Sequence, residues 1–116
     1  MVDFKIHGVD WTLRVAEEDE TIEGEGVGLC DYCTYTITVI NGLKKSQLRT
    51  VLIHELTHAF RWTYGIVSEL ELANIPWSEV EEIAANTVEV FAEEILECVD
   101  EIMDCLTNEE VQDGDQ

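Results

Sequence analysis

One stretch near the middle of the chain, VLIHELTHAF at positions 51–60, constrains the fold more than any other. Its apolar residues recur at helical spacing, which places one side of a helix in a core. His54 and His58 are four residues apart, so their side chains project from a single face on the other side. The stretch therefore predicts a helix from about Lys44 to Tyr64, with one side buried and the other facing a cleft.

The same stretch contains the pattern H-E-x-x-H. Two neutral imidazoles at this separation are able to hold one Zn²⁺, and Glu55 lies beside them, where it can take a proton from water. Three fixed positions also arise by chance on a helix that faces solvent. Because a catalytic zinc site uses three protein ligands and keeps one position open, a third ligand elsewhere in the chain is needed to decide the matter.

A second long helix is predicted from about Trp77 to Leu106. It follows Pro76, the single proline of the chain, which marks a boundary. Ser78 and Glu81 fit a capping box, with Ser78 as the N-cap and Glu81 reaching back to its backbone. Further along, apolar residues at helical spacing trace one buried face.

Glu82 is the first candidate for the third ligand. It lies on the side of the second helix that faces away from the apolar stripe, and two helices packed side by side would bring it to the histidines. Glu81 is the rival ligand, although the capping box gives Glu81 another role. In a chain so rich in Glu, a solvated acidic helix without any metal is a further interpretation.

At this point the sequence resembles a known family. The pairing of HELTHAF at 54–60 with EIAAN at 82–86 is similar to small zincins of the gluzincin type. The group that it resembles is that of the ImmA/IrrE-type metallopeptidases, especially the short members encoded by phages and prophages. The resemblance covers roughly residues 30–95.

The resemblance implies that His54, His58 and Glu82 bind Zn²⁺ and that Glu55 acts as general base in the hydrolysis of a peptide bond. It also implies that the strand near 34–40 flanks the cleft. Members that act on transcriptional repressors often carry extra domains, for which this chain has no room. A non-catalytic zinc-binding module that keeps the zincin fold and holds a partner is the alternative function.

Charge limits the partners that this chain can have. It contains 26 Asp and Glu against 6 Lys and Arg, a formal net charge of −20. Such a surface repels phosphate, which argues against nucleic acid and anionic membranes. It would attract a basic protein or peptide substrate; the alternative interpretation is that the charge only maintains solubility. No apolar run is long enough to span a bilayer, and the N-terminus lacks a signal-peptide pattern, so we expect a cytoplasmic protein.

Strand patterns occupy the first part of the chain. Residues 3–7 and 9–15 alternate apolar and polar around Gly8, which predicts a tight hairpin. Residues 32–40 are rich in β-branched and aromatic side chains and end at Asn41-Gly42, so they predict a further strand. If that strand is an exposed edge, a peptide can pair with its backbone.

Together these elements predict an α+β fold, and the resemblance described above implies that it is of the zincin-like type. A small, mostly antiparallel sheet of three or four strands packs on two long helices. One domain is expected over residues 1–106, followed by an acidic, flexible tail at 107–116.

Other polar and sulfur-bearing residues leave alternatives open. Tyr64, Tyr35, Tyr32 and His7 are all candidates for stabilising the oxyanion of a tetrahedral intermediate. The four cysteines are expected to be reduced thiols. Those at 98 and 105 are interpreted as core residues, and the CxxC pair at 30 and 33 lacks the second pair that a zinc ribbon needs.

Overall fold

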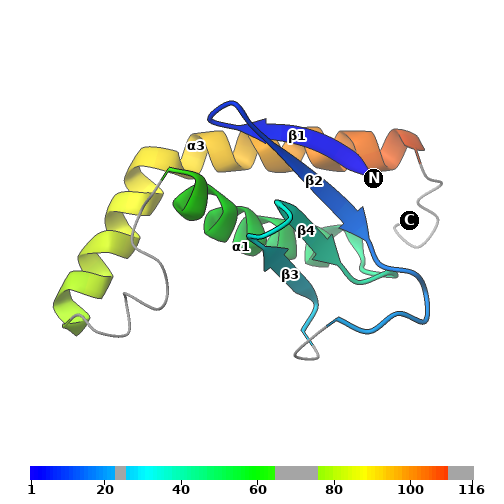
Figure 1. Cartoon of the computed structure of the whole chain (residues 1–116), viewed down its shortest axis with the longest axis horizontal. Coiled ribbons are helices and arrows are strands. Elements are labelled where there is room, and N and C mark those ends of the chain that lie inside the picture. The colour runs from blue at the N-terminus through cyan, green and yellow to red at the C-terminus, as the bar shows by residue number, and fades with distance from the viewer. Residues whose placement is uncertain (23–25, 65–75, 110–116) are drawn as a thin grey trace.

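The structure is a computed structural model that describes residues 1–22, 26–64 and 76–109 (Figure 1). Its elements, in chain order, are strands β1 (Val2–Ile6), β2 (Val9–Val15), β3 (Gly28–Asp31) and β4 (Thr36–Val39), followed by helices α1 (Lys45–Thr63) and α3 (Trp77–Glu109). The predicted connection between the helices and the last residues of the predicted acidic tail lie outside the described residues.

The predicted hairpin is confirmed as β1 and β2. His7 and Gly8 form its two-residue turn, with φ values of 50° and 77°. Both residues therefore adopt left-handed conformations, which match the twist of a two-residue hairpin. Phe4, Ile6 and Leu13 all point into the core, as the alternation predicts.

The four strands form a mixed sheet in the order β1-β2-β4-β3. The β1–β2 and β3–β4 pairings are antiparallel, whereas β2 and β4 are parallel, with Leu13 opposite Ile37. The expected mostly antiparallel sheet thus holds for two of its three pairings. The strand near 34–40 is not an edge, because β4 lies between β2 and β3; the two edges of the described sheet are β1 and β3.

The strand predicted at 32–40 is shorter than expected because its first residues form a turn. Asp31 Oδ1 accepts backbone N–H groups from Cys33 at 2.9 Å and Thr34 at 3.3 Å. Tyr35 follows with a φ of 52°. A side chain that accepts backbone N–H groups two and three residues ahead reverses the chain locally, so β4 begins only at Thr36.

The N-terminus of α1 is closed by a contact between its N-cap and its first turn. Lys44 is the N-cap, and its backbone N–H donates to Oε1 of Gln47 at 3.0 Å. This bond satisfies a donor just outside the helix.

Helix α3 begins one residue before Ser78, at Trp77, and ends at Glu109 rather than Leu106. Ser78 is therefore part of the first turn and not the N-cap. Because Ser78 is not the N-cap, Glu81 has no capping box to complete, and this distinction between Glu81 and Glu82 disappears. Both side chains are exposed.

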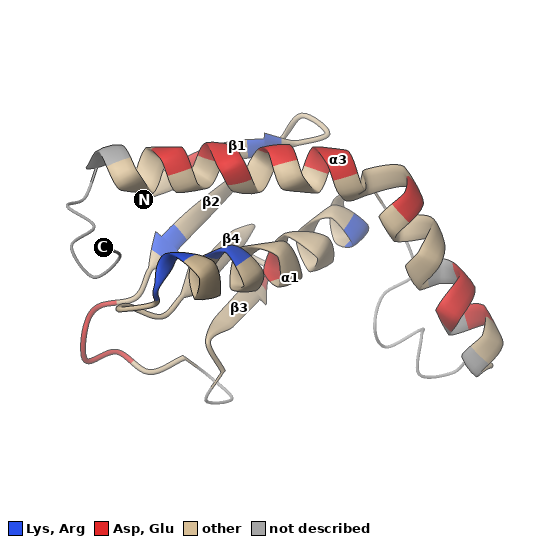
Figure 2. Cartoon of the chain, turned by 180° about the vertical axis from the view of Figure 1, so that it is seen from behind, with Lys and Arg blue, Asp and Glu red and all other residues tan. Residues whose placement is uncertain are grey.

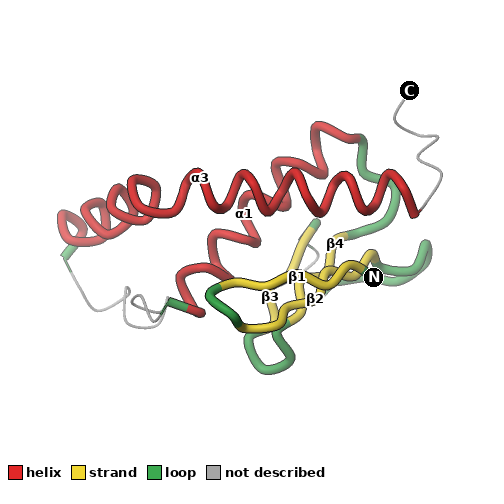
Figure 3. The backbone as a smooth tube through the Cα atoms, turned by 90° about the horizontal axis from the view of Figure 1, so that it is seen from above, coloured by secondary structure: helices red, strands yellow, loops and turns green. Residues whose placement is uncertain are grey.

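Both helices cover the same face of the sheet, which gives two layers (Figure 3). The core lies between the layers, where Leu13, Ile37 and Leu56 are fully buried. Phe60 of α1 and Phe91 of α3 join the helices, with ring centroids 6.0 Å apart. The fold is therefore α+β, built around the apolar side of α1.

Charge is unevenly distributed over these elements. Acidic residues run along α3, which carries none of the chain's Lys or Arg residues (Figure 2). Arg49 on α1 forms an ion pair with Asp100 on α3. Within the part of the chain that the structure describes, neither helix has the length and apolar character needed to cross a membrane.

Candidate metal centre

His54 and His58 lie side by side near the middle of α1. Their Nε2 atoms are 3.3 Å apart, and the ring planes are tilted by 73°. Two nitrogen ligands at about 2.0–2.1 Å from one tetrahedral zinc ion are separated by roughly 3.3–3.4 Å. The side chain of His54 is 69% exposed, so an ion can approach from solvent. The spacing of the two imidazoles thus fits a single ion.

The same spacing is compatible with a hydrogen bond between the rings. A neutral imidazole has one donor and one acceptor nitrogen, so one ring can donate to the other when no ion is bound. The distance alone is therefore consistent with both arrangements.

Glu55 lies beside the pair but faces inward. Its Oε2 atom is 4.0 Å from His54 Nε2, and its side chain is only 9% exposed. The helical position explains both facts, because residue 55 is one step around the axis from residue 54 and borders the core face. The carboxylate therefore sits at the boundary between the core and the two histidines.

Strand β3 packs against α1 at this place, and Gly28 allows the close approach. A Cβ atom at position 28 would lie 2.8 Å from Val51 Cγ1 and 3.0 Å from both Cγ and Oε2 of Glu55. Only a residue without a side chain fits there without a shift. The sequence patterns predicted neither this contact nor the strand that starts at Gly28.

An aromatic pair extends the histidine face of α1. Trp62 is one helical turn after His58, and its ring stacks on Tyr32 with centroids 4.7 Å apart and planes at 19°. Trp62 is 44% exposed, so the pair borders solvent. The i, i+4 relation of His58 to Trp62 was the feature of the sequence that could have revealed this neighbour.

Glu82 is not brought to the histidines. It lies in the first turns of α3, which extend past the C-terminal end of α1 (Figure 1). Over the described ranges, no three His, Cys, Asp or Glu side chains gather in a way that could hold a metal ion. Glu82, with Glu81 as its rival, stays a prediction for the third ligand.

Two of the four oxyanion candidates have other neighbours. Tyr64 Oη donates to Glu94 Oε2 at 3.4 Å, and the His7 ring packs on Tyr64 at 4.6 Å. Burial and then Glu94 raise the pKa of Tyr64. Tyr64, the C-cap of α1, is six positions after His58 and therefore roughly 240° around the helix axis from it, which turns it toward α3 and away from the histidine pair.

The other two candidates lie on the β3–β4 side of the sheet. Tyr35 packs edge-on against Trp11, with centroids 5.3 Å apart. Tyr32, by contrast, reaches α1 through Trp62. Of the four, Tyr32 is the residue whose contacts connect it to the histidine face.

The four cysteines, all within the described ranges, are reduced thiols, as expected. Cys98 is buried, and this burial, followed by the charge of Glu101, raises its pKa to about 12. Cys105 is exposed, so its interpretation as a core residue was wrong. The Cys30–Cys33 pair spans the start of the β3–β4 turn.

Comparisons of the chain with protein-family models, with curated proteins and with solved structures find no match. The arrangement of the residues themselves is therefore the basis for any functional proposal.

Proposed function

We propose that this protein is a zinc-dependent peptidase with a zincin-like site, in which His54 and His58 bind the metal. The observation that supports this most is the 3.3 Å separation of the two Nε2 atoms, which suits neighbouring ligands of one tetrahedral ion. Glu82 is proposed as the third ligand. A bound zinc ion supplies Lewis acidity, which polarises a carbonyl group and makes water more acidic.

Glu55 is proposed as the general base. It accepts a proton from the attacking water and passes it to the leaving amine. Its burial supports this role. A carboxylate beside the core costs more free energy than an apolar residue would, so stability alone does not account for a glutamate at this position. Contact with Gly28 on one side and His54 on the other limits the directions in which the carboxylate can point.

Strand β3 is proposed to align the substrate. It is an edge of the sheet and packs on α1 beside Glu55. An extended peptide that pairs with this edge would run past the histidines. Tyr32 is then the proposed donor to the oxyanion, since its stacking on Trp62 holds it on the same side of α1.

A non-catalytic zinc-binding module is the second candidate function. The exposed position of Glu82, away from the histidine pair, favours it. A site with two protein ligands holds a metal more weakly and is suited to binding rather than hydrolysis.

Zinc binding tests the metal site first. Titration of the apoprotein with zinc, read by equilibrium dialysis, should give binding that weakens by more than about 100-fold in His54→Ala and His58→Ala. His7→Ala is the matched control, because His7 is the third histidine of the chain and lies against Tyr64 instead. A Cys30→Ser, Cys33→Ser variant removes the thiols that could compete for zinc. If His54→Ala and His7→Ala bind zinc equally well, the metal site is refuted.

Glu55→Gln then separates the two functions. Incubation with a library of cytoplasmic peptides, followed by mass spectrometry, should show cleavage by the zinc-loaded protein. The rate should fall by about 10²-fold or more in Glu55→Gln while zinc stays bound. Cleavage that is unchanged in Glu55→Gln, or absent from the unaltered protein, contradicts the peptidase proposal.

The variants Glu82→Gln and Glu81→Gln identify the third ligand. The one that weakens zinc binding in the same titration has lost a ligand.

A further inference from the structure

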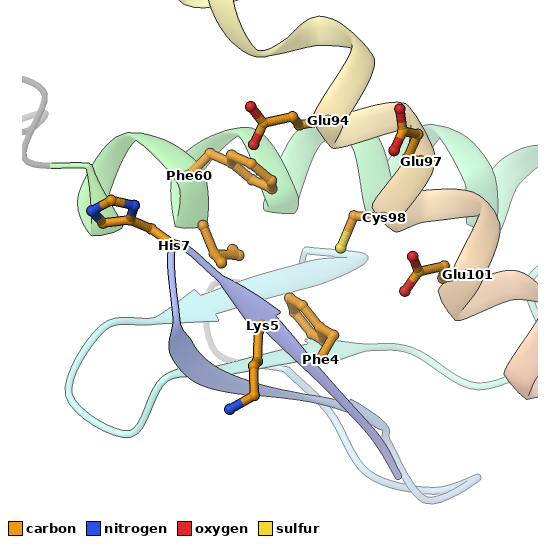
Figure 4. Close-up of a pocket in the computed structure, with 9 residues that line it drawn as sticks. Phe4, Lys5, His7, Phe60, Glu94, Glu97, Cys98 and Glu101 are labelled. Atoms are coloured by element: carbon orange, nitrogen blue, oxygen red, sulfur yellow. The ribbon is translucent and has the colours of Figure 1, made fainter.

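A groove of about 170 Å³ lies between β1 and α3, with Phe60 of α1 also lining it (Figure 4). Phe4 and Phe60 contribute apolar surface to its floor. Glu94, Glu97 and Glu101 line the side that α3 forms. None of the histidine pair, Glu55 or the residues of β3 takes part in it.

The three carboxylates of the groove belong to one stripe of α3. Positions 94, 97 and 101 are three and four residues apart, so their side chains stand next to one another on the helix surface. All three are exposed. Like charges at this spacing repel one another, and a cation placed between them relieves that repulsion.

The cation that β1 contributes is directed elsewhere. Lys5 is one of the residues that line the groove, but its ammonium group pairs with Asp10 across the hairpin. Figure 4 shows the Lys5 side chain pointing away from the carboxylates of α3. Since α3 itself has no Lys or Arg, its own helix supplies no compensating charge (Figure 2).

Neighbouring groups respond to this negative charge. Burial raises the pKa of the Cys98 thiol, and the charge of Glu101 raises it further. Burial and then Glu94 have the same effect on Tyr64. Burial is the larger cause in both groups, and the neighbouring carboxylate adds to it because a negative charge disfavours a second anion beside it.

The shape of the groove limits the kind of occupant. Pockets for drug-sized ligands measure about 300–1,000 Å³, so this groove suits a single long side chain better. Its other wall is β1, which stands at one end of the strand order and pairs only with β2 in the described sheet. An extended segment lying along β1 can therefore find backbone partners there.

We propose that the groove between β1 and α3 docks a basic segment of a partner protein, with a lysine or arginine head among Glu94, Glu97 and Glu101. The alkyl stem of that side chain lies on Phe4 and Phe60, because long basic side chains bury their stems while the charge stays in a polar setting. Charge complementarity selects this occupant over a second copy of the chain, whose formal charge is also −20. The proposal does not depend on zinc or on peptidase activity.

The test uses a short fluorescent peptide of alternating Lys and Val, and a matched peptide with Gln in place of Lys. Binding to the full chain is measured by anisotropy at about 150 mM salt, where long-range attraction is largely screened. The groove variant combines Glu94→Gln, Glu97→Gln and Glu101→Gln.

The control variant makes three equivalent changes on the same helix but outside the groove, at exposed residues. It combines Glu79→Gln, Glu89→Gln and Glu93→Gln, so both variants lose the same net charge. Circular dichroism checks that both are folded.

The Lys peptide should bind and the Gln peptide should not. The groove variant should weaken binding by about tenfold or more, and the control variant by less than about threefold. Amide NMR shifts caused by the peptide should cluster at residues 4–7 and 94–101.

Three results would overturn the proposal. The first is no binding of the Lys peptide, and the second is an equal loss in both variants, which would indicate non-specific attraction to an acidic protein. The third is complete displacement of the peptide by spermine at matched charge concentration, which would indicate a site for small cations alone.

Discussion

At residue 28, the absence of a side chain determines how closely a strand approaches the candidate site. Replacing Gly28 with alanine places a Cβ atom within 3.0 Å of atoms of Val51 and Glu55. We expect Gly28→Ala to lower the free energy of unfolding by about 1–3 kcal/mol, because overpacking a tight contact forces its neighbours to move. Urea unfolding followed by circular dichroism measures this.

Gly26→Ala is the matched control for that substitution. A Cβ atom there would lie 3.5 Å from the carbonyl oxygen of Gly28, which is an ordinary contact. Its effect should stay within about 0.5 kcal/mol. Equal stability of the two variants would mean that β3 does not press on Glu55.

The thiols differ in reactivity at the residue scale. Alkylation of the folded protein near pH 8 should modify the exposed Cys33 and Cys105 first and Cys98 last, because burial raises the pKa of Cys98 to about 12. Mass spectrometry of peptides from timed samples gives the order, and the denatured protein serves as the control. Rapid modification of Cys98 in the folded state would contradict its burial.

The same pKa has a consequence for stability in alkali. The unfolded thiol ionises near its ordinary value of 9.0, whereas the folded thiol keeps its proton until about pH 12. Between these two pH values only the unfolded state is stabilised by ionisation of the thiol, so the free energy of unfolding falls. The contribution of the Cys98 thiol to the free energy of unfolding is therefore fully present below about pH 9 and decreases as the pH rises from there toward 12.

At the scale of the element, α1 combines a structural face with a chemical one. Leu56 is fully buried under the sheet, and His54 faces solvent. We expect Leu56→Ala to cost about 2–5 kcal/mol through lost burial and a cavity. His54→Ala should change stability by no more than about 0.5 kcal/mol while it removes zinc binding. Denaturant unfolding of the two variants without metal makes the comparison, and similar losses would show that the faces are not separate.

Elements whose cause is local were predictable from the sequence. The hairpin follows from alternation around Gly8, and the two long helices follow from apolar residues at helical spacing. The turn at Asp31 escaped notice because its side-chain hydrogen bonds compete with the β propensity of the following residues. Strand β3 has only 4 residues, which is too few for a recognisable alternation of apolar and polar side chains.

Contacts between elements were harder to predict than the elements. The distance between the His54 and His58 side chains depends on one helix alone, and the two rings lie close together as the sequence predicts. The approach of Glu82 depends instead on how two helices pack, and one-dimensional periodicity contains no such information. The parallel pairing of β2 with β4 is likewise set by the tertiary arrangement, because other residues intervene between them.

At the scale of the whole molecule, the formal charge of −20 opposes folding through self-repulsion. Opposite charges offset it only locally, as where Arg14 pairs with Glu20 and Arg49 with Asp100. Added NaCl screens repulsion among the many exposed carboxylates more than it weakens these few pairs. We therefore expect the melting temperature near pH 7 to rise by several degrees between about 10 and 300 mM NaCl.

Repeating the salt series at lower pH identifies the cause of that rise. Most exposed carboxylates become neutral as the pH falls below about 4, so the repulsion that salt screens should shrink there. Glu20 behaves differently, because its hydrogen bonds from Arg14 lower its pKa to about 2. Its stabilising pair is complete above the ordinary pKa near 4.5 and is lost only as the pH falls toward 2. Calorimetry at pH 7 and pH 4 gives the comparison. A melting temperature that falls with salt at pH 7 would mean that ion pairs, and not net repulsion, dominate the electrostatics of this chain.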